Sequence, residues 1–184
     1  MSSRFVEPRE SIDYVYVIHA QLDRVAKART QLYKNGLSVN PFETGVTNYL
    51  FALESLHAIL LPELRGNSKK YINLAWKLLY LDMAIEGTRG KERNSITIPP
   101  YKSQSDKLTK LKEERERIIP KDVKEQLYEM CYYMAYRAAA LVADKALEEM
   151  LRKLNEAGLL IRGKAIKVGI PHGASELDKK GNEV

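Results

Sequence analysis

Few side chains in this sequence have the types and spacing that acid–base or metal chemistry requires. The chain holds three histidines, and only His57 follows a glutamate, Glu54, at a separation of three residues. That spacing places two side chains one helical turn apart, as in the ligand pairs of di-iron helical bundles. Those bundles need a second Glu-x-x-His pair, which this sequence lacks. We therefore interpret His57 as a core histidine and expect no metal or other cofactor. Glu54 and His57, which His19 and Asp23 could face, are the weak candidates for a metal-dependent bundle enzyme.

Nucleophilic and nucleotide chemistry also lack their usual motifs. The sequence contains no Gly-Lys-Ser/Thr phosphate loop, no Gly-x-Ser-x-Gly and no Cys-x-x-Cys. Its single cysteine, Cys131, falls on an apolar stripe, where a thiol is usually inert packing. One thiol cannot form an internal disulfide, which favours a reducing compartment. We expect no catalytic residues and a protein that is not an enzyme.

Positive charge is concentrated in one short segment. The net charge is +6, and residues 88–112 hold seven Lys/Arg against two Asp/Glu, whereas the flanking parts are close to balance. Basic segments suit phosphate backbones, because each cation that displaces a condensed counterion adds salt-sensitive affinity. An aromatic ring among them suits stacking on an unpaired base. The residues predicted to bind nucleic acid are Arg89, Lys91, Arg93, Tyr101, Lys102, Lys107, Lys110 and Lys112, with a lesser cluster of Arg162, Lys164 and Lys167.

Three functions remain open from these patterns. The leading hypothesis is a non-enzymatic, self-associating helical protein that binds DNA, RNA or another polyanion in an accessory or packaging role. The alternative is a structural or adaptor subunit of a larger protein assembly without nucleic-acid contact. In that case the basic segment is solvated, or it meets the acidic run Glu113-Glu114-Arg115-Glu116 of a neighbouring chain. The third is the metal-dependent enzyme.

Apolar spacing predicts a mostly α fold, a bundle of about five helices. We expect helices over residues 11–35, 41–61, 69–86, 105–119 and 121–157, within a helical bundle spanning 1–158. Glycines and the Pro99-Pro100 pair predict a long irregular basic loop over 88–104. Period-two alternation predicts a β-hairpin at 159–170, and a polar flexible tail follows at 171–184. The helix over 69–86 is apolar on both sides, so it is either central in its own domain or shared with another chain.

The last predicted helix carries two apolar stripes, displaced by about 180 degrees on a wheel of 3.6 residues per turn. One stripe stops halfway, and the other recurs every three or four residues, as in a coiled-coil seam. A continuous helix would pair the second stripe with another copy, giving a homodimer or higher oligomer that Ala143→Glu should separate. A break near Asp144 would instead turn both stripes to one core. The predicted self-association residues are Tyr133, Tyr136, Ala140, Ala143, Leu147, Met150 and Leu154.

Composition limits the remaining possibilities. A chain of 184 residues with 45% hydrophobic content can bury one core without staples. The first residues lack the apolar region of a signal peptide, and no stretch has about 18 apolar residues free of charge. We therefore expect a cytoplasmic protein with no membrane contact. Scarce glutamine and plentiful lysine and glutamate are typical of thermophilic sources.

Overall fold

The computed structural model describes residues 8–34, 45–94, 100–129 and 136–160. Six α-helices and one short 3-10 helix make up these residues, and they contain no strand. The prediction of a mostly α fold is therefore confirmed for this part of the chain. The expected hairpin over 159–170 and the tail over 171–184 lie, apart from Leu159 and Leu160, outside the described residues.

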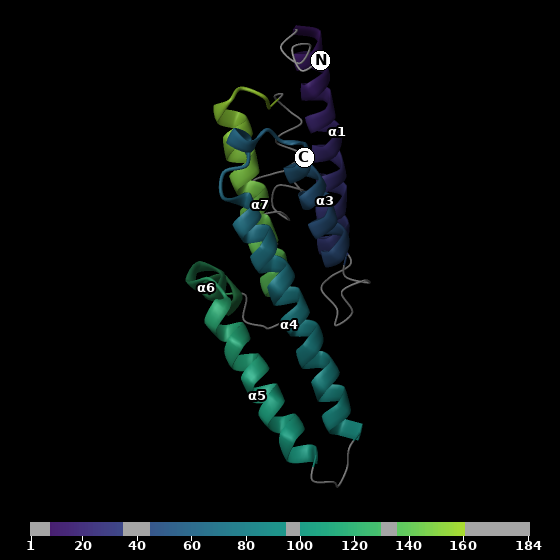
Figure 1. Cartoon of the computed structure of the whole chain (residues 1–184), viewed down its shortest axis with the longest axis vertical. Helices are drawn as coiled ribbons and strands as arrows, with labels where there is room; N and C mark the ends of the chain where they lie inside the picture. The colour runs from purple at the N-terminus through teal and green to yellow at the C-terminus, as the bar shows by residue number, and fades with distance from the viewer. Residues whose placement is uncertain (1–7, 35–44, 95–99, 130–135, 161–184) are drawn as a thin grey trace.

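The first two helices form an antiparallel pair (Figure 1). Helix α1 spans Pro8–Lys34, which confirms the first predicted helix, and its apolar positions such as Leu22 and Val25 are buried. Helix α3 spans Val46–Ile59 and begins after Gly45, whose φ of 82° is a conformation that glycine adopts without strain. The expected start at Pro41 lies outside the described residues. The chain leaves α3 through the 3-10 helix η2, Pro62–Leu64.

Helix α4 is much longer than the sequence pattern predicts. It spans Ser68–Asn94 and passes through Gly87 and Gly90, and α5 spans Pro100–Ile118. The predicted irregular loop over 88–104 is therefore wrong for residues 88–94 and 100–104. Glycine inside a helix costs only about 1 kcal/mol, a cost that the packing of α4 against α5 can offset. Pro100 stands at the first position of α5, where its missing N–H is no loss.

Helix α4 is the central element of the molecule. Its first half packs against α3 and α7, and its second half packs against α5 (Figure 1). The chain runs down α4, returns along α5, passes through α6, Lys121–Glu129, and then continues in the same direction along α7, Arg137–Glu156. The first of our two interpretations of this two-sided helix, a central place in its own domain, therefore holds.

The prediction of one continuous helix over 121–157 is wrong. Helix α6 ends at Glu129, and Tyr136, the N-cap of α7, has a left-handed φ of 68°. Asp82 of α4 accepts a hydrogen bond from the Tyr136 N–H at 3.2 Å, which stabilises this conformation. The alternative of a broken helix was correct in kind, but the break lies before Arg137 instead of near Asp144. Helix α7 ends at Glu156, and Gly158, the predicted stop signal, follows it in a Schellman motif.

A buried polar cluster joins three helices inside the bundle. The Asp144 carboxylate of α7 accepts two hydrogen bonds from Arg29 of α1, at 2.9 and 3.1 Å. The hydroxyls of Tyr33 and Tyr49 donate to the same carboxylate at 2.7 and 2.6 Å. Burial alone would lower the pKa of Arg29, but Asp144 raises it overall, so the guanidinium stays charged. Asp144 therefore holds α1 and α3 against α7.

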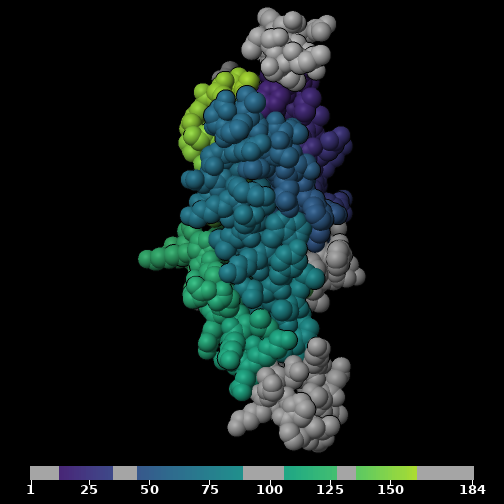
Figure 2. All heavy atoms as spheres, viewed as in Figure 1, coloured from purple at the N-terminus to yellow at the C-terminus, as the bar shows by residue number. Residues whose placement is uncertain are grey.

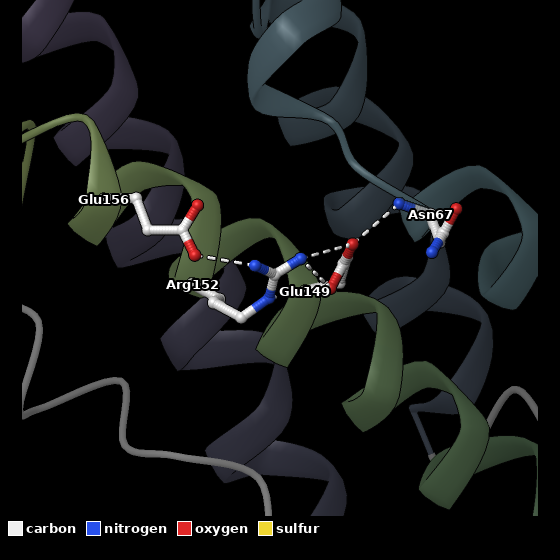
Figure 3. A network of polar contacts seen from close by, with 4 residues as sticks. All are labelled: Asn67, Glu149, Arg152 and Glu156. Atoms are coloured by element: carbon white, nitrogen blue, oxygen red, sulfur yellow. Dashed lines mark hydrogen bonds and ion pairs between the residues drawn. The ribbon is translucent and has the colours of Figure 1, made fainter.

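A second polar contact fixes the turn from η2 into α4. Figure 3 shows the Glu149 carboxylate of α7 accepting a hydrogen bond from the backbone N–H of Asn67, at 2.9 Å, and ion pairs from Arg152. An anion at this place satisfies a free N–H at the start of α4 and favours the helix dipole. The neighbouring Gly66 has a φ of 52°, and a Cβ there would collide with the Glu149 carboxylate.

Candidate nucleic-acid interface

The basic segment forms one end of an elongated helical arm. We define the arm as residues 82–94 of α4 with residues 100–118 of α5. These two antiparallel stretches pack mainly on each other, and they extend away from α1, α3 and α7 (Figures 1 and 2). The far end of the arm is therefore made by the last turns of α4 and the first turns of α5.

The structure brings the predicted contact residues of this segment onto these two helices. Arg89, Lys91 and Arg93 belong to the last turns of α4, and Tyr101 and Lys102 belong to the first turn of α5. The remaining three, Lys107, Lys110 and Lys112, follow along α5 with exposed side chains. Two antiparallel helices thus carry all eight residues, six of them in the far half of the arm and Lys110 and Lys112 just beyond its midpoint.

Two glutamates of the acidic run of α5 are paired with cations of their own chain, at the base of the arm. Glu114 pairs with Arg117 at 2.6 Å and with Lys77 of α4 at 3.4 Å. The hydrogen bond from Arg117 holds the pKa of Glu114 below its usual value. Glu116 lies 3.5 Å from Lys124 of α6. These glutamates have cationic partners in their own chain, which weakens the interpretation that they meet the basic segment of a neighbour.

A buried ion pair joins the two helices of the arm at its base, and one of its members also contacts α7. The Arg115 Nε of α5 lies 2.5 Å from the Asp82 Oδ1 of α4, and both side chains are buried. The second oxygen of Asp82 accepts the Tyr136 N–H at the start of α7. Burial and the carboxylates of Glu86 and Asp82 raise the pKa of Tyr136 to about 12. One aspartate therefore fixes α4, α5 and α7 at their meeting point.

The predicted self-association seam is an internal packing seam. Its described members are all buried within the single chain, where they face α3 and α4: Tyr136, Ala140, Ala143, Leu147, Met150 and Leu154. Their stripe faces inward because the break at Tyr136 frees α7 to rotate independently of α6. These residues cannot also cover a second copy, so the prediction of a partner at this seam is corrected. Tyr133 lies outside the described residues, as do Cys131 and the hairpin cations Arg162, Lys164 and Lys167.

The two metal candidates lie in ordinary helical surroundings. Glu54 accepts a hydrogen bond from the Trp76 indole N–H, which occupies one of its oxygens. Desolvation, together with Arg65 and Lys69, lowers the pKa of the half-buried His57. Among the residues that the structure describes, no group of three or more His, Cys, Asp or Glu side chains could hold a metal ion. The geometry gives the enzyme hypothesis no support.

The sequence patterns missed an exposed aromatic face beside the arm. Phe51 of α3 and Tyr80 of α4 are 57% and 60% exposed, and Met83 is 37% exposed. Trp76 contacts the rings of Phe51 and Tyr80, and Met83 follows Tyr80 by three residues on α4. We call these four residues the aromatic face. Phe51 and Tyr80 each lie on the exposed side of their own helix, outside its buried stripe, so a search for apolar spacing passes over them.

Comparisons with known proteins add no relative to this description. No protein-family model, no curated protein and no solved structure matches the chain. Within the described ranges, no helix is both long and apolar enough to cross a membrane.

Proposed function

We propose that this chain is a non-enzymatic nucleic-acid-binding protein whose contact surface is the basic end of the arm. Its role is accessory, because phosphate contacts provide affinity and position without reading sequence. The proposal does not include self-association through α7, since that seam is used inside the chain.

The observation that carries the proposal is the separation of charge along the arm. Seven Lys/Arg and two Asp/Glu lie in residues 88–112, whereas the glutamates nearer the base pair with cations of their own chain. Lys107 and Lys110 are exposed one helical turn apart on α5. Such a row can follow a phosphate backbone, and the cations gain affinity by releasing its counterions.

Binding of random-sequence DNA and RNA at about 50 and about 200 mM salt tests the proposal. We expect a mobility shift at the lower salt that weakens steeply at the higher. The double variant Lys107→Ala/Lys110→Ala should weaken binding, and should flatten the salt slope by about 0.7 to 0.9 per lost phosphate contact. The matched control is Lys27→Ala/Lys34→Ala, which removes two exposed lysines from α1.

Equal losses in both double variants would show that overall charge, not the arm, attracts the nucleic acid. Absence of any shift at the lower salt would refute nucleic-acid binding and favour the structural or adaptor role.

A further inference from the structure

The exposed side of α3 that carries Phe51 has no charged residue, and the exposed positions of α4 that follow Lys77, as far as Gly87, have none either. On α3 the exposed positions are Asn48, Phe51, Ser55 and Ala58, none of them ionisable. On α4 the exposed Lys77 pairs with Glu114, and the exposed positions after it, Tyr80, Met83 and Gly87, are uncharged and follow one another at separations of three and four residues. In a chain whose charged content is 29%, an uncharged surface of this kind is suited to a ligand with apolar, planar groups.

The rings of this face are held in a stacked arrangement. Trp76 and Tyr80 lie nearly parallel, with centroids 5.8 Å apart and an interplanar angle of 22°. Phe51 meets Trp76 edge to face at 5.2 Å. The hydrogen bond from Trp76 to Glu54 fixes the orientation of the indole. The outer surfaces of Phe51 and Tyr80 are therefore presented by a preformed cluster, at little cost in side-chain entropy.

The same side of α4 leads from these rings to the basic end of the arm. The series Trp76, Tyr80, Met83 and Gly87 continues in sequence with Lys91, with no acidic residue at any of its positions. Asp82 and Glu86 lie instead toward Tyr136. Trp76 precedes Arg93 by 17 residues, about 25 Å of helix at 1.5 Å per residue. That length matches about seven nucleotides stacked at 3.4 Å each.

We infer that the aromatic face binds the unpaired bases of a single-stranded nucleic acid whose phosphates contact the basic end of the arm. This inference rests on the proposed function and specifies its substrate. Aromatic side chains stack on any base, and unpaired bases are exposed for stacking only in single strands. The Glu54 carboxylate beside Trp76 repels phosphate, so this part of the surface suits neutral bases better than backbone.

Trp76 is the only tryptophan of the chain, so its fluorescence reports directly on the face. The experiment titrates the full chain with a single strand of about ten nucleotides, the matching duplex, and inorganic polyphosphate, which has charge but no bases. We expect the single strand to quench Trp76 and to bind more tightly than the duplex. Tyr80→Ala and Phe51→Ala should each weaken single-strand binding by about 5- to 150-fold and leave polyphosphate binding unchanged.

Two control variants test whether binding depends on the aromatic ring of Tyr80 and on its position in the aromatic face. Tyr80→Phe keeps the stacking surface and should keep the affinity, whereas Tyr16→Ala removes a 66% exposed tyrosine from α1 and should change nothing. If all three ligands bind without changing Trp76 emission, this inference fails while the proposed function stands. If none binds, both fail. If Trp76 emission changes with protein concentration alone, the face pairs two copies and the inference is overturned.

Discussion

Asp144 is the residue on which the interior of the bundle most depends. Its side chain is almost fully buried, and it accepts hydrogen bonds from one arginine and two tyrosines on two other helices. A buried carboxylate is tolerated only when its charge and its lone pairs are satisfied, and here Arg29 supplies the opposite charge. The cluster therefore specifies how α1, α3 and α7 fit together more than it adds net stability.

Removing one partner from this cluster should be costly. We expect Asp144→Ala to lower the free energy of unfolding by about 3 to 5 kcal/mol, because Arg29 would remain charged and unpaired in the core. Tyr49→Phe removes one hydrogen bond and should cost about 1 kcal/mol. Urea unfolding measures both changes, with Tyr16→Phe as the exposed control. A loss below about 1 kcal/mol for Asp144→Ala would contradict the described cluster.

Alkaline pH should weaken the fold through the same cluster. Burial, and then the Asp144 carboxylate, raise the pKa of Tyr49 well above its ordinary value of 10.0. The unfolded chain loses this proton near pH 10 while the folded chain keeps it, so the stabilisation is complete below that pH and declines above it. Spectrophotometric titration should show tyrosines that ionise only on unfolding, fewer of them in Tyr49→Phe. Ionisation of all eleven near pH 10 in the folded protein would contradict this expectation.

The sequence predicted which segments are helical, but it did not predict where several of the helices end. Periodic apolar positions identified α1, α3 and the first part of α4 because each buries one stripe. The chain breaks before α7 at Tyr136, a position that is neither glycine nor proline. Asp82, which stabilises the conformation of Tyr136, lies 54 positions earlier in the sequence. Contacts over such separations leave no trace in local sequence.

The candidate site, too, was predicted only in part from the sequence. Counting charges located the basic segment, but Gly87, Gly90 and Pro100 favoured a loop where the chain is helical. The packing of α4 against α5, a tertiary effect, overrides that local preference. The aromatic face was missed because Phe51 and Tyr80 lie outside the buried stripes of α3 and α4, and a search for apolar periodicity does not register single exposed rings.

Two glycine-to-alanine substitutions, one inside α4 and one just before it, should change the free energy of unfolding in opposite directions. A Cβ at Gly87 would meet open space inside a helix, so Gly87→Ala should raise the free energy of unfolding by up to about 1 kcal/mol. Gly66→Ala should lower it by about 1 to 2 kcal/mol, because Gly66 has a φ of 52° and faces Glu149. Thermal or urea unfolding measures both. If both substitutions changed the free energy of unfolding in the same direction, the described conformation at Gly66 or at Gly87 would be contradicted.

The internal position of the α7 seam makes a further prediction. Ala143 is fully buried in the chain, so Ala143→Glu should destabilise or unfold the protein by placing a carboxylate in the core. A surface seam would give the other result, a folded monomer released from a dimer. Circular dichroism together with sedimentation distinguishes these outcomes, and Glu148→Ala on the exposed side of α7 is the control.

As a whole, the molecule consists of a packed body and an arm with different composition. The body of α1, α3, α7 and the first half of α4 contains most of the buried apolar residues, whereas the arm continues from α4 and contacts α7 through the hydrogen bond between Asp82 and Tyr136. Cations gather at the far end of the arm, and uncharged aromatic side chains lie where it meets the body.

Photo-crosslinking of the full chain to random-sequence single strands, with mapping of the linked peptides, tests this account most directly. We expect the crosslinked peptides to fall within residues 76–112 and on the part of α3 that contains Phe51, and to disappear as salt is raised. Crosslinks that fall mainly on α1 or on α7, or that persist unchanged at high salt, would contradict the assignment of the arm as the nucleic-acid interface.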